Sequence, residues 1–212
     1  VVLPGTAYME MALASGVERG LGQSSSDKPR RVLSDLVLYE PLILSAEDTG
    51  KNAKKVRCLI SKDGSFEVVS AGSGESSRSH ARGHFDVSSS GDVDLSSANL
   101  VELEDRCNLE VNTGELYEKL REAGFEYGPR FQTIRQAWGS GKGEALGVVS
   151  VRDPQDACWD SSFHMHPAVL DGALQLIAVA MTEGGNLENS DMMVPYSLKR
   201  YSVLGKVGLN EV

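Results

Sequence analysis

The chain has 212 residues, of which 41% are hydrophobic and 24% are charged, which is enough for one sizeable globular domain or two small packed halves. Its net charge of -9 argues against a nucleic-acid partner, because no excess of Lys and Arg is present to displace counterions from phosphates. Nothing at the start resembles a secretory signal, and the apolar runs are too short to span a bilayer, so we expect a cytoplasmic protein without a membrane partner. Cys58, Cys107 and Cys158 are odd in number and far apart, which predicts no disulfide.

The first part of the chain is predicted to form one helix and several antiparallel strands. The helix runs from Pro4 to about Gly16, with Pro as a start signal and Gly as a stop signal. Strands are predicted at 32–39, 42–44, 55–61, 66–70 and 79–87, with a hairpin turn at 62–65. Alternation along the last strand places His80, Arg82 and His84 on one face, which we expect to be solvated.

The second part of the chain repeats these ingredients after a stretch rich in Ser, Asp and Gly. We therefore predict a first half at 1–87, a linker at 88–111 and a second half at 112–212. Asn112 or Thr113 can cap a helix that ends before Gly124. A hairpin at 133–138 and 144–151 follows, and its glycine-rich turn joins two strands, unlike a phosphate-binding loop. These patterns predict an α+β fold in which a sheet wraps a central helix in each half.

The most informative segment is the apolar stretch at 166–180, which carries one carboxylate and one amide four residues apart. The segment predicts a helix buried nearly all round, with Pro167 in its first turn. Burying the carboxyl of Asp171 raises its pKa and keeps it protonated over part of the neutral range, as a general acid requires. Gln175 lies one turn later and can orient that carboxyl by a hydrogen bond. The alternative is a carboxyl that is satisfied by backbone amides and has no further role.

Four ordered motifs resemble the dehydratase domain of a modular polyketide synthase. They are LPGTAYMEMA at 3–12, YGPRFQ at 127–132, HPAVLDGALQ at 166–175 and VPYS at 194–197, and the segment SHARG at 79–83 is also similar to that family. The resemblance implies a double hotdog fold, in which each half is an antiparallel sheet around a long central helix. It also implies an active site between the two halves.

The resemblance further implies the removal of water from a β-hydroxyacyl thioester on the phosphopantetheine arm of an acyl carrier protein. Such a reaction needs a base and an acid. Asp171 matches the acid of the family, Gln175 matches the residue four positions later, and Tyr127 matches a tyrosine that orients the carboxyl. The remaining motif positions are expected to contact substrate, and they are Pro4, Gly5, Tyr8, Gly128, Pro129, Phe131, Pro195 and Tyr196. No metal and no cofactor of the domain's own is expected.

In this family a histidine acts as the base, and it belongs to a motif whose proline matches Pro4. The position of that histidine therefore falls before Val1. We therefore expect a chain that is truncated at both ends and that is inactive alone. His164 and His166 are weak substitutes, and with Cys158 they match no standard zinc spacing. Neighbouring synthase domains and a second copy of the chain are expected partners. A non-catalytic acyl-binding scaffold, or a relative that catalyses cyclisation or double-bond isomerisation, remains the alternative.

Overall fold

A computed structural model describes residues 1–21, 30–50, 53–72, 76–88, 99–150, 163–181 and 195–204. The chain divides into two compact units, and each of them combines segments that are distant in sequence. The first unit contains Val1–Gly91, Ser162–Pro167 and Val194–Val207, and the second contains Asp92–Ser161, Ala168–Met193 and Gly208–Val212. Within the described ranges, no helix is both long and apolar enough to cross a membrane.

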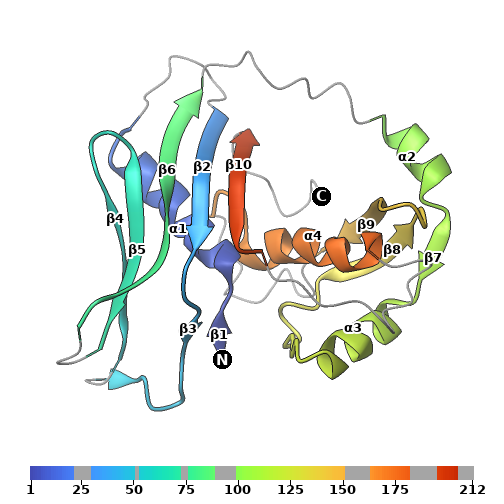
Figure 1. Cartoon of the computed structure of the whole chain (residues 1–212), viewed down its shortest axis with the longest axis horizontal. Coiled ribbons are helices and arrows are strands. Elements are labelled where there is room, and N and C mark those ends of the chain that lie inside the picture. The colour runs from blue at the N-terminus through green and yellow to red at the C-terminus, as the bar shows by residue number, and fades with distance from the viewer. Residues whose placement is uncertain are drawn as a thin grey trace. The chain divides into compact units, whose positions relative to one another are not determined.

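The first unit is built on a five-stranded antiparallel sheet (Figure 1). Its strands follow the order β10-β2-β6-β5-β4, and their bounds are Ser197–Leu204, Arg30–Leu38, Arg78–Ser88, Ser65–Ala71 and Lys55–Ile60. A separate pair is formed by β1 (Val2–Leu3) and β3 (Leu42–Ile43). The predicted hairpin turn joins β4 to β5, where Gly64 adopts a φ of 90° and its N–H donates to the Ser61 carbonyl at 3.1 Å. The strands predicted for this half are confirmed.

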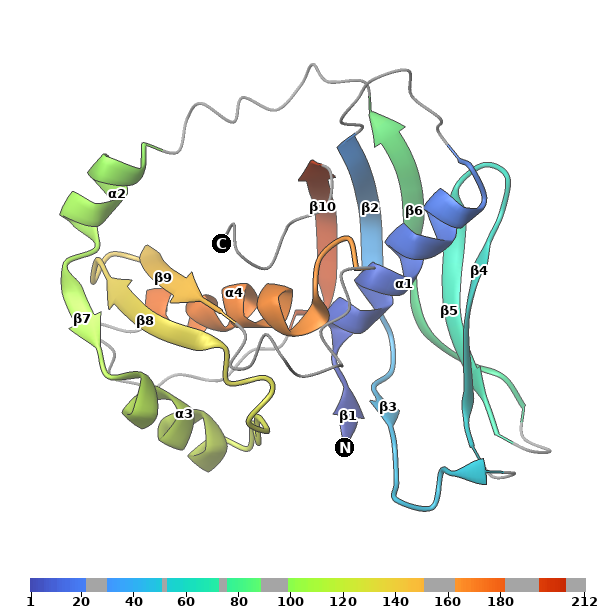
Figure 2. The same ribbon diagram turned by 180° about the vertical axis from the view of Figure 1, so that it is seen from behind.

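Helix α1 (Gly5–Glu18) lies across one face of this sheet, as Figures 1 and 2 show from opposite sides. Pro4 precedes the first turn, and its carbonyl accepts a hydrogen bond from the N–H of Ala7 at 3.0 Å. Ala12 and Leu13 are fully buried in the unit's core, so the apolar residues of the helix supply its packing surface. The predicted helix is confirmed, and it extends slightly beyond Gly16.

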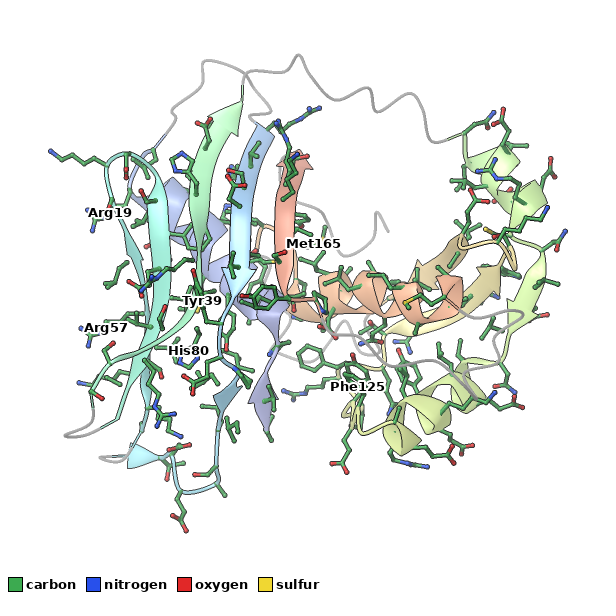
Figure 3. All side chains as sticks on the ribbon, in the orientation of Figure 1. Arg19, Tyr39, Arg57, His80, Phe125 and Met165 are labelled. Carbon is green, nitrogen blue, oxygen red and sulfur yellow. The ribbon has the colours of Figure 1, made fainter. Side chains whose placement is uncertain are left out.

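The prediction that His80 is solvated is wrong, because a β-bulge interrupts the alternation of β6. The pairing of β5 with β6 shifts register between Val68 and Val69, where the partners change from Ala81 to Ser79. The residue between those partners, His80, is labelled in Figure 3 and is only 2% exposed. Its ring stacks on the ring of Tyr8. An extra residue in a bulge turns neighbouring side chains toward the same face, which regular alternation does not predict.

The second unit combines a three-stranded sheet with a long helix. The sheet has the order β7-β8-β9, with bounds Leu109–Val111, Ile134–Gly139 and Ala145–Val149, and the helix is α4 (Pro167–Ala180), which begins in the first unit at Pro167. Helix α3 (Thr113–Glu122) is capped by Asn112, whose side chain accepts from the N–H groups of Gly114 and Glu115. Gly124, with a φ of 93°, follows its end. The predicted helices and the β8–β9 hairpin are confirmed.

Two segments differ in structure or in pairing from what the sequence predicted. Residues expected as linker form α2 (Leu100–Arg106) and β7, and β7 pairs with β8. Helix α2 has no buried residue, and its seven residues are too few for an apolar period to identify a helix. Strand β10, expected in the second half, pairs instead with β2 of the first unit. Register between strands distant in sequence is set by tertiary packing, which local patterns do not encode.

Candidate active site

Asp171 projects from the second turn of α4 in the second unit. The helix starts at Pro167, in the position where a missing backbone donor costs nothing. Burial raises the pKa of the Asp171 carboxyl, and a hydrogen bond from Gln175 opposes that rise without cancelling it. The helix is not buried on all sides, because Ile177 is 48% exposed. Asp171 itself is partly buried, which leaves a carboxyl with a raised proton affinity within reach of solvent or substrate.

Gln175 holds one oxygen of this carboxyl. Its side-chain nitrogen donates to Asp171 Oδ2 at 2.7 Å and to the Phe131 carbonyl at 3.0 Å. Gln175 is 5% exposed, so its amide groups depend on protein partners. The predicted hydrogen bond between residues four apart on the helix is present in the structure.

Tyr117 completes this arrangement, and the sequence motifs did not single it out. Its hydroxyl donates to Gln175 Oε1 at 2.9 Å and accepts from the backbone N–H of Ile134 at 3.1 Å. Tyr117 lies on α3 beside the buried Leu116, so from sequence it is one more apolar residue of an amphipathic helix. Its contribution to the site becomes visible only in the structure, where its hydroxyl is hydrogen-bonded to the buried side-chain amide of Gln175, 58 positions later.

Tyr127 lies in the turn after α3, and its ring packs against two aromatic neighbours. The ring centroid is 6.3 Å from that of Tyr117 and 6.4 Å from that of Phe125, which is labelled in Figure 3. Burial raises the pKa of Tyr127 to about 12, and the charges of Asp171 and Tyr117 add to the effect. The phenol is therefore neutral at physiological pH and is electrostatically linked to Asp171. Its orienting hydrogen bond to that carboxyl stays a prediction.

The turn that follows Tyr127 contributes mainly through its backbone. The Phe131 N–H donates to the Gly128 carbonyl at 2.9 Å, and the Gln132 side chain donates to the Tyr127 carbonyl at 2.9 Å. Gly128 and Pro129 are exposed, whereas Phe131 is partly buried. The turn thus presents the Phe131 carbonyl to Gln175, and substrate contact by these residues stays a prediction.

The other predicted substrate contacts lie in the first unit. Pro4 and Gly5 form the start of α1, and a Cβ on Gly5 would come within 2.7 Å of a Leu38 methyl. Tyr8 is 2% exposed, and its hydroxyl accepts from the Leu42 N–H at 3.1 Å, which gives it a packing role. Pro195 and Tyr196 are exposed just before β10, where the Tyr196 carbonyl accepts from the Leu38 N–H at 2.8 Å. Whether these residues also contact substrate stays a prediction.

A second buried carboxylate, Glu10, lies within the first unit and was also missed. Its Oε1 accepts from the His164 N–H at 2.9 Å and lies 3.1 Å from His164 Nδ1, and its Oε2 accepts from the Met165 N–H at 3.0 Å. Met165 is labelled in Figure 3. Burial lowers the pKa of the neighbouring His166 to about 4, although Glu10 opposes that shift. The His166 imidazole is therefore neutral at physiological pH and a weak base.

The described part of the chain contains no group of three or more His, Cys, Asp or Glu side chains that could hold a metal ion. Cys58 and Cys107 are free thiols, and Cys158 lies outside the described residues. At the candidate site, burial raises the pKa of the Asp171 carboxyl, which favours its protonated form, and Gln175 holds one of its oxygens.

Comparison with known proteins identifies the class. Residues 96–208, more than half of the chain, match the model of the polyketide synthase dehydratase N-terminal domain. The chain is 30% identical over 220 residues to the polyketide synthase GfsE of Streptomyces halstedii, with 96% of this chain and 5% of the relative covered. It is 30% identical to the mycoketide-CoA synthase of Mycobacterium tuberculosis, with 85% of this chain and 4% of the relative covered.

Solved structures show the same fold. An inactive mutant of the CurK dehydratase matches with a TM-score of 0.77 at 23% identity, covering 98% of this chain and 69% of that one. GphF dehydratase 1 matches with a TM-score of 0.74 at 24% identity, covering 97% of this chain and 68% of that one. The chain belongs to the polyketide synthase dehydratase family and has its double hotdog fold, as predicted. It spans only a small part of the curated synthases that it matches.

Proposed function

We propose that this chain is part of a dehydratase domain that removes water from a β-hydroxyacyl thioester carried by an acyl carrier protein. The product is an α,β-unsaturated acyl chain. One observation supports this proposal above the others: a carboxyl with a raised pKa is held by an amide whose partners are all fixed. A raised pKa favours the protonated form of a carboxyl, which is the form that can donate a proton to a departing hydroxyl.

In this proposal Asp171 is the general acid. A histidine base removes the proton beside the thioester carbonyl, and the electron pair of that C–H bond forms the new double bond. The bond between the β-carbon and its hydroxyl breaks, and the departing oxygen takes the Asp171 proton and leaves as water. The base has gained one proton and Asp171 has lost one, so exchange with solvent restores both groups.

The histidine base is proposed to precede Val1 in the complete domain, as the family motif around Pro4 implies. Support comes from one solved relative, the CurK dehydratase, in which an aspartate-to-asparagine mutant and a histidine-to-phenylalanine mutant are both inactive. We transfer the aspartate to Asp171 because it is the carboxyl that the structure buries on a central helix beside a fixed amide.

The partners proposed for the complete protein are an acyl carrier protein with its phosphopantetheine arm, the neighbouring synthase domains and a second copy of the dehydratase domain. The phosphopantetheine arm belongs to the substrate, and no cofactor of the domain's own is part of the proposal. The proposed location is the cytoplasm.

The test is turnover of a β-hydroxyacyl thioester by the complete dehydratase domain, followed by mass spectrometry for loss of water. Asp171→Asn should lower the rate by roughly a hundredfold or more, since general acids contribute about 10²–10⁴-fold. The matched control is Asp105→Asn on α2, where the carboxyl is exposed and the rate should not change.

Three results would contradict parts of the proposal. An Asp171→Asn variant with a near-wild-type rate would exclude this residue as the acid. No water loss by the folded wild-type domain with several substrates would favour the non-catalytic scaffold. Formation of a ring or a shifted double bond would favour the cyclising or isomerising relatives.

A further inference from the structure

The neighbours of the Tyr117 hydroxyl determine which hydrogen bond it donates and which it accepts. The Ile134 N–H can only donate, so the Tyr117 oxygen accepts from it at 3.1 Å. The hydroxyl hydrogen is then free to donate to Gln175 Oε1, 2.9 Å away. Because Ile134 begins β8, a sheet strand fixes the position of this hydroxyl.

The Gln175 amide is fixed in turn by partners on both sides. Its nitrogen faces two acceptors, the Phe131 carbonyl and Asp171 Oδ2, and its two hydrogens satisfy both. If the amide were reversed, its oxygen would face those two acceptors and its nitrogen would lose them. The orientation therefore follows from the chemistry of the neighbours, with the Tyr117 hydroxyl on the oxygen side.

This arrangement distinguishes the two oxygens of Asp171. Oδ2 accepts an N–H from Gln175 at 2.7 Å, which suits the carbonyl oxygen of a protonated carboxyl. The acidic hydrogen then belongs on Oδ1, the oxygen without this donor. We propose, on the basis of the proposed dehydratase function, that Tyr117 is a positioning residue that acts through Gln175 so that Asp171 delivers its proton from Oδ1.

Other ionisable groups near the carboxyl lie on two neighbouring segments. Tyr117 on α3 and Tyr127 in the following turn are electrostatically coupled to Asp171, and both phenols have raised pKa values because they are buried. Arg135 on β8 interacts with Tyr117, and its guanidinium donates to the Ser150 carbonyl at 2.7 Å. Tyr117→Phe leaves the Tyr127 phenol and the Arg135 guanidinium in the protein, so we assign a change in the Asp171 titration to the lost contact with Gln175.

The test is Tyr117→Phe in the complete domain, with two readouts. The first is the titration of the Asp171 carboxyl by carbon NMR, assigned by difference from Asp171→Asn. The Gln175 hydrogen bond lowers the Asp171 pKa, so a loosened Gln175 should move the titration to higher pH. The second is the pH profile of kcat, whose high-pH limb should move in the same direction, while kcat falls by about tenfold and KM changes little.

Thr133→Val is the matched control. It also deletes a buried hydroxyl that contacts α4, because Thr133 Oγ1 donates to the Ala168 carbonyl at 3.0 Å. Thr133 has no hydrogen bond to Gln175 or Asp171 among those that the described residues form, so the control should leave the Asp171 titration in place. If Tyr117→Phe does not fold, Gln175→Leu tests the same link from its other end and should shift the titration at least as far.

The double variant Tyr117→Phe/Gln175→Leu separates a linked pair from two independent effects. We expect it to shift the titration no further than Gln175→Leu alone, because the hydroxyl acts through the amide. An unshifted titration in folded Tyr117→Phe, a shift equal to that of Thr133→Val, or full additivity in the double variant would each overturn the proposal. Failure of the dehydratase function would appear separately, as wild-type protein without turnover, and the NMR titration would still decide the role of Tyr117.

Discussion

Replacing Glu10 with Gln should destabilise the first unit, because this carboxylate binds three donors at once. The side chain is 8% exposed, and its partner His164 is 7% exposed, so water cannot take the place of a missing acceptor. An amide keeps one acceptor oxygen and puts an NH₂ group where the second stood. In the better orientation, that NH₂ faces the Met165 N–H, now 3.0 Å from a donor instead of an acceptor.

The magnitude follows from the hydrogen bonds that the amide cannot make. A hydrogen bond to a charged group contributes about 1.5–3 kcal/mol, and a buried donor without a partner costs about 1–3 kcal/mol. Glu10→Gln removes at least one such bond and leaves one donor unpaired, so we expect a decrease of roughly 2–4 kcal/mol in the free energy of unfolding. For a chain of this size, each kcal/mol lowers Tm by about 2–4 °C, which predicts a fall on the order of 10 °C.

The assay is thermal and urea unfolding of the complete domain, followed by circular dichroism. Glu18→Gln is the matched control, because Glu18 lies exposed at the end of the same helix and its replacement should change stability by less than about 0.5 kcal/mol. A Glu10→Gln variant as stable as the Glu18→Gln control would refute the argument that these hydrogen bonds hold residues 163–165.

Two further predictions concern packing and pH. Gly16→Ala should lower the free energy of unfolding by about 1–2 kcal/mol, although alanine favours helix by about 1 kcal/mol. The new Cβ would lie 2.5 Å from the ring of Phe85, which is 2% exposed and cannot move aside, and a thermal melt at or above the wild-type value would contradict this. Asp171→Asn should raise stability at neutral pH, because the raised pKa of Asp171 means that the folded state binds its proton more tightly than the unfolded state does. The free energy of unfolding of the wild type should therefore fall relative to that of the variant as pH rises from the usual aspartate pKa range through the raised pKa of Asp171. Urea unfolding at several pH values measures this, and a difference between the two proteins that does not change with pH would contradict the prediction.

The strands and helices that carry periodic apolar residues were predictable from the sequence, whereas two kinds of element were not. Helix α2 has seven residues and none of them is buried, so the segment is too short for an apolar period to mark it. The burial of His80 depends on a one-residue register shift between β5 and β6, and the identity of the residues does not reveal a bulge. Local patterns therefore predicted the elements that bury a face, and they failed where pairing across the sheet decides burial.

The sequence singled out Asp171 for a reason that applies to a second residue as well. Asp171 was recognised because a carboxylate stands in an apolar helix, and Glu10 stands among Tyr8, Met9 and Met11 in the same way. The same argument, applied to both helices, would have found both buried carboxylates. Tyr117 could not be found like this, because a tyrosine beside leucines fits an ordinary core, and its hydroxyl acquires a role only when the chain brings Gln175 to it.

The position of β10 at the edge of β2 has a consequence for the order of folding during synthesis. Strand β2 pairs with β6 on one side and with β10 on the other. Strand β6 follows β2 within the same part of the chain, whereas β10 comes much later. About 160 residues separate β2 from β10, so at about 5–20 residues per second the ribosome needs roughly 10–30 s to supply the missing neighbour. During that time the open edge of β2 can pair with other nascent chains. The first unit begins to emerge before the second, but it is completed only after all of the second unit's described elements have been made.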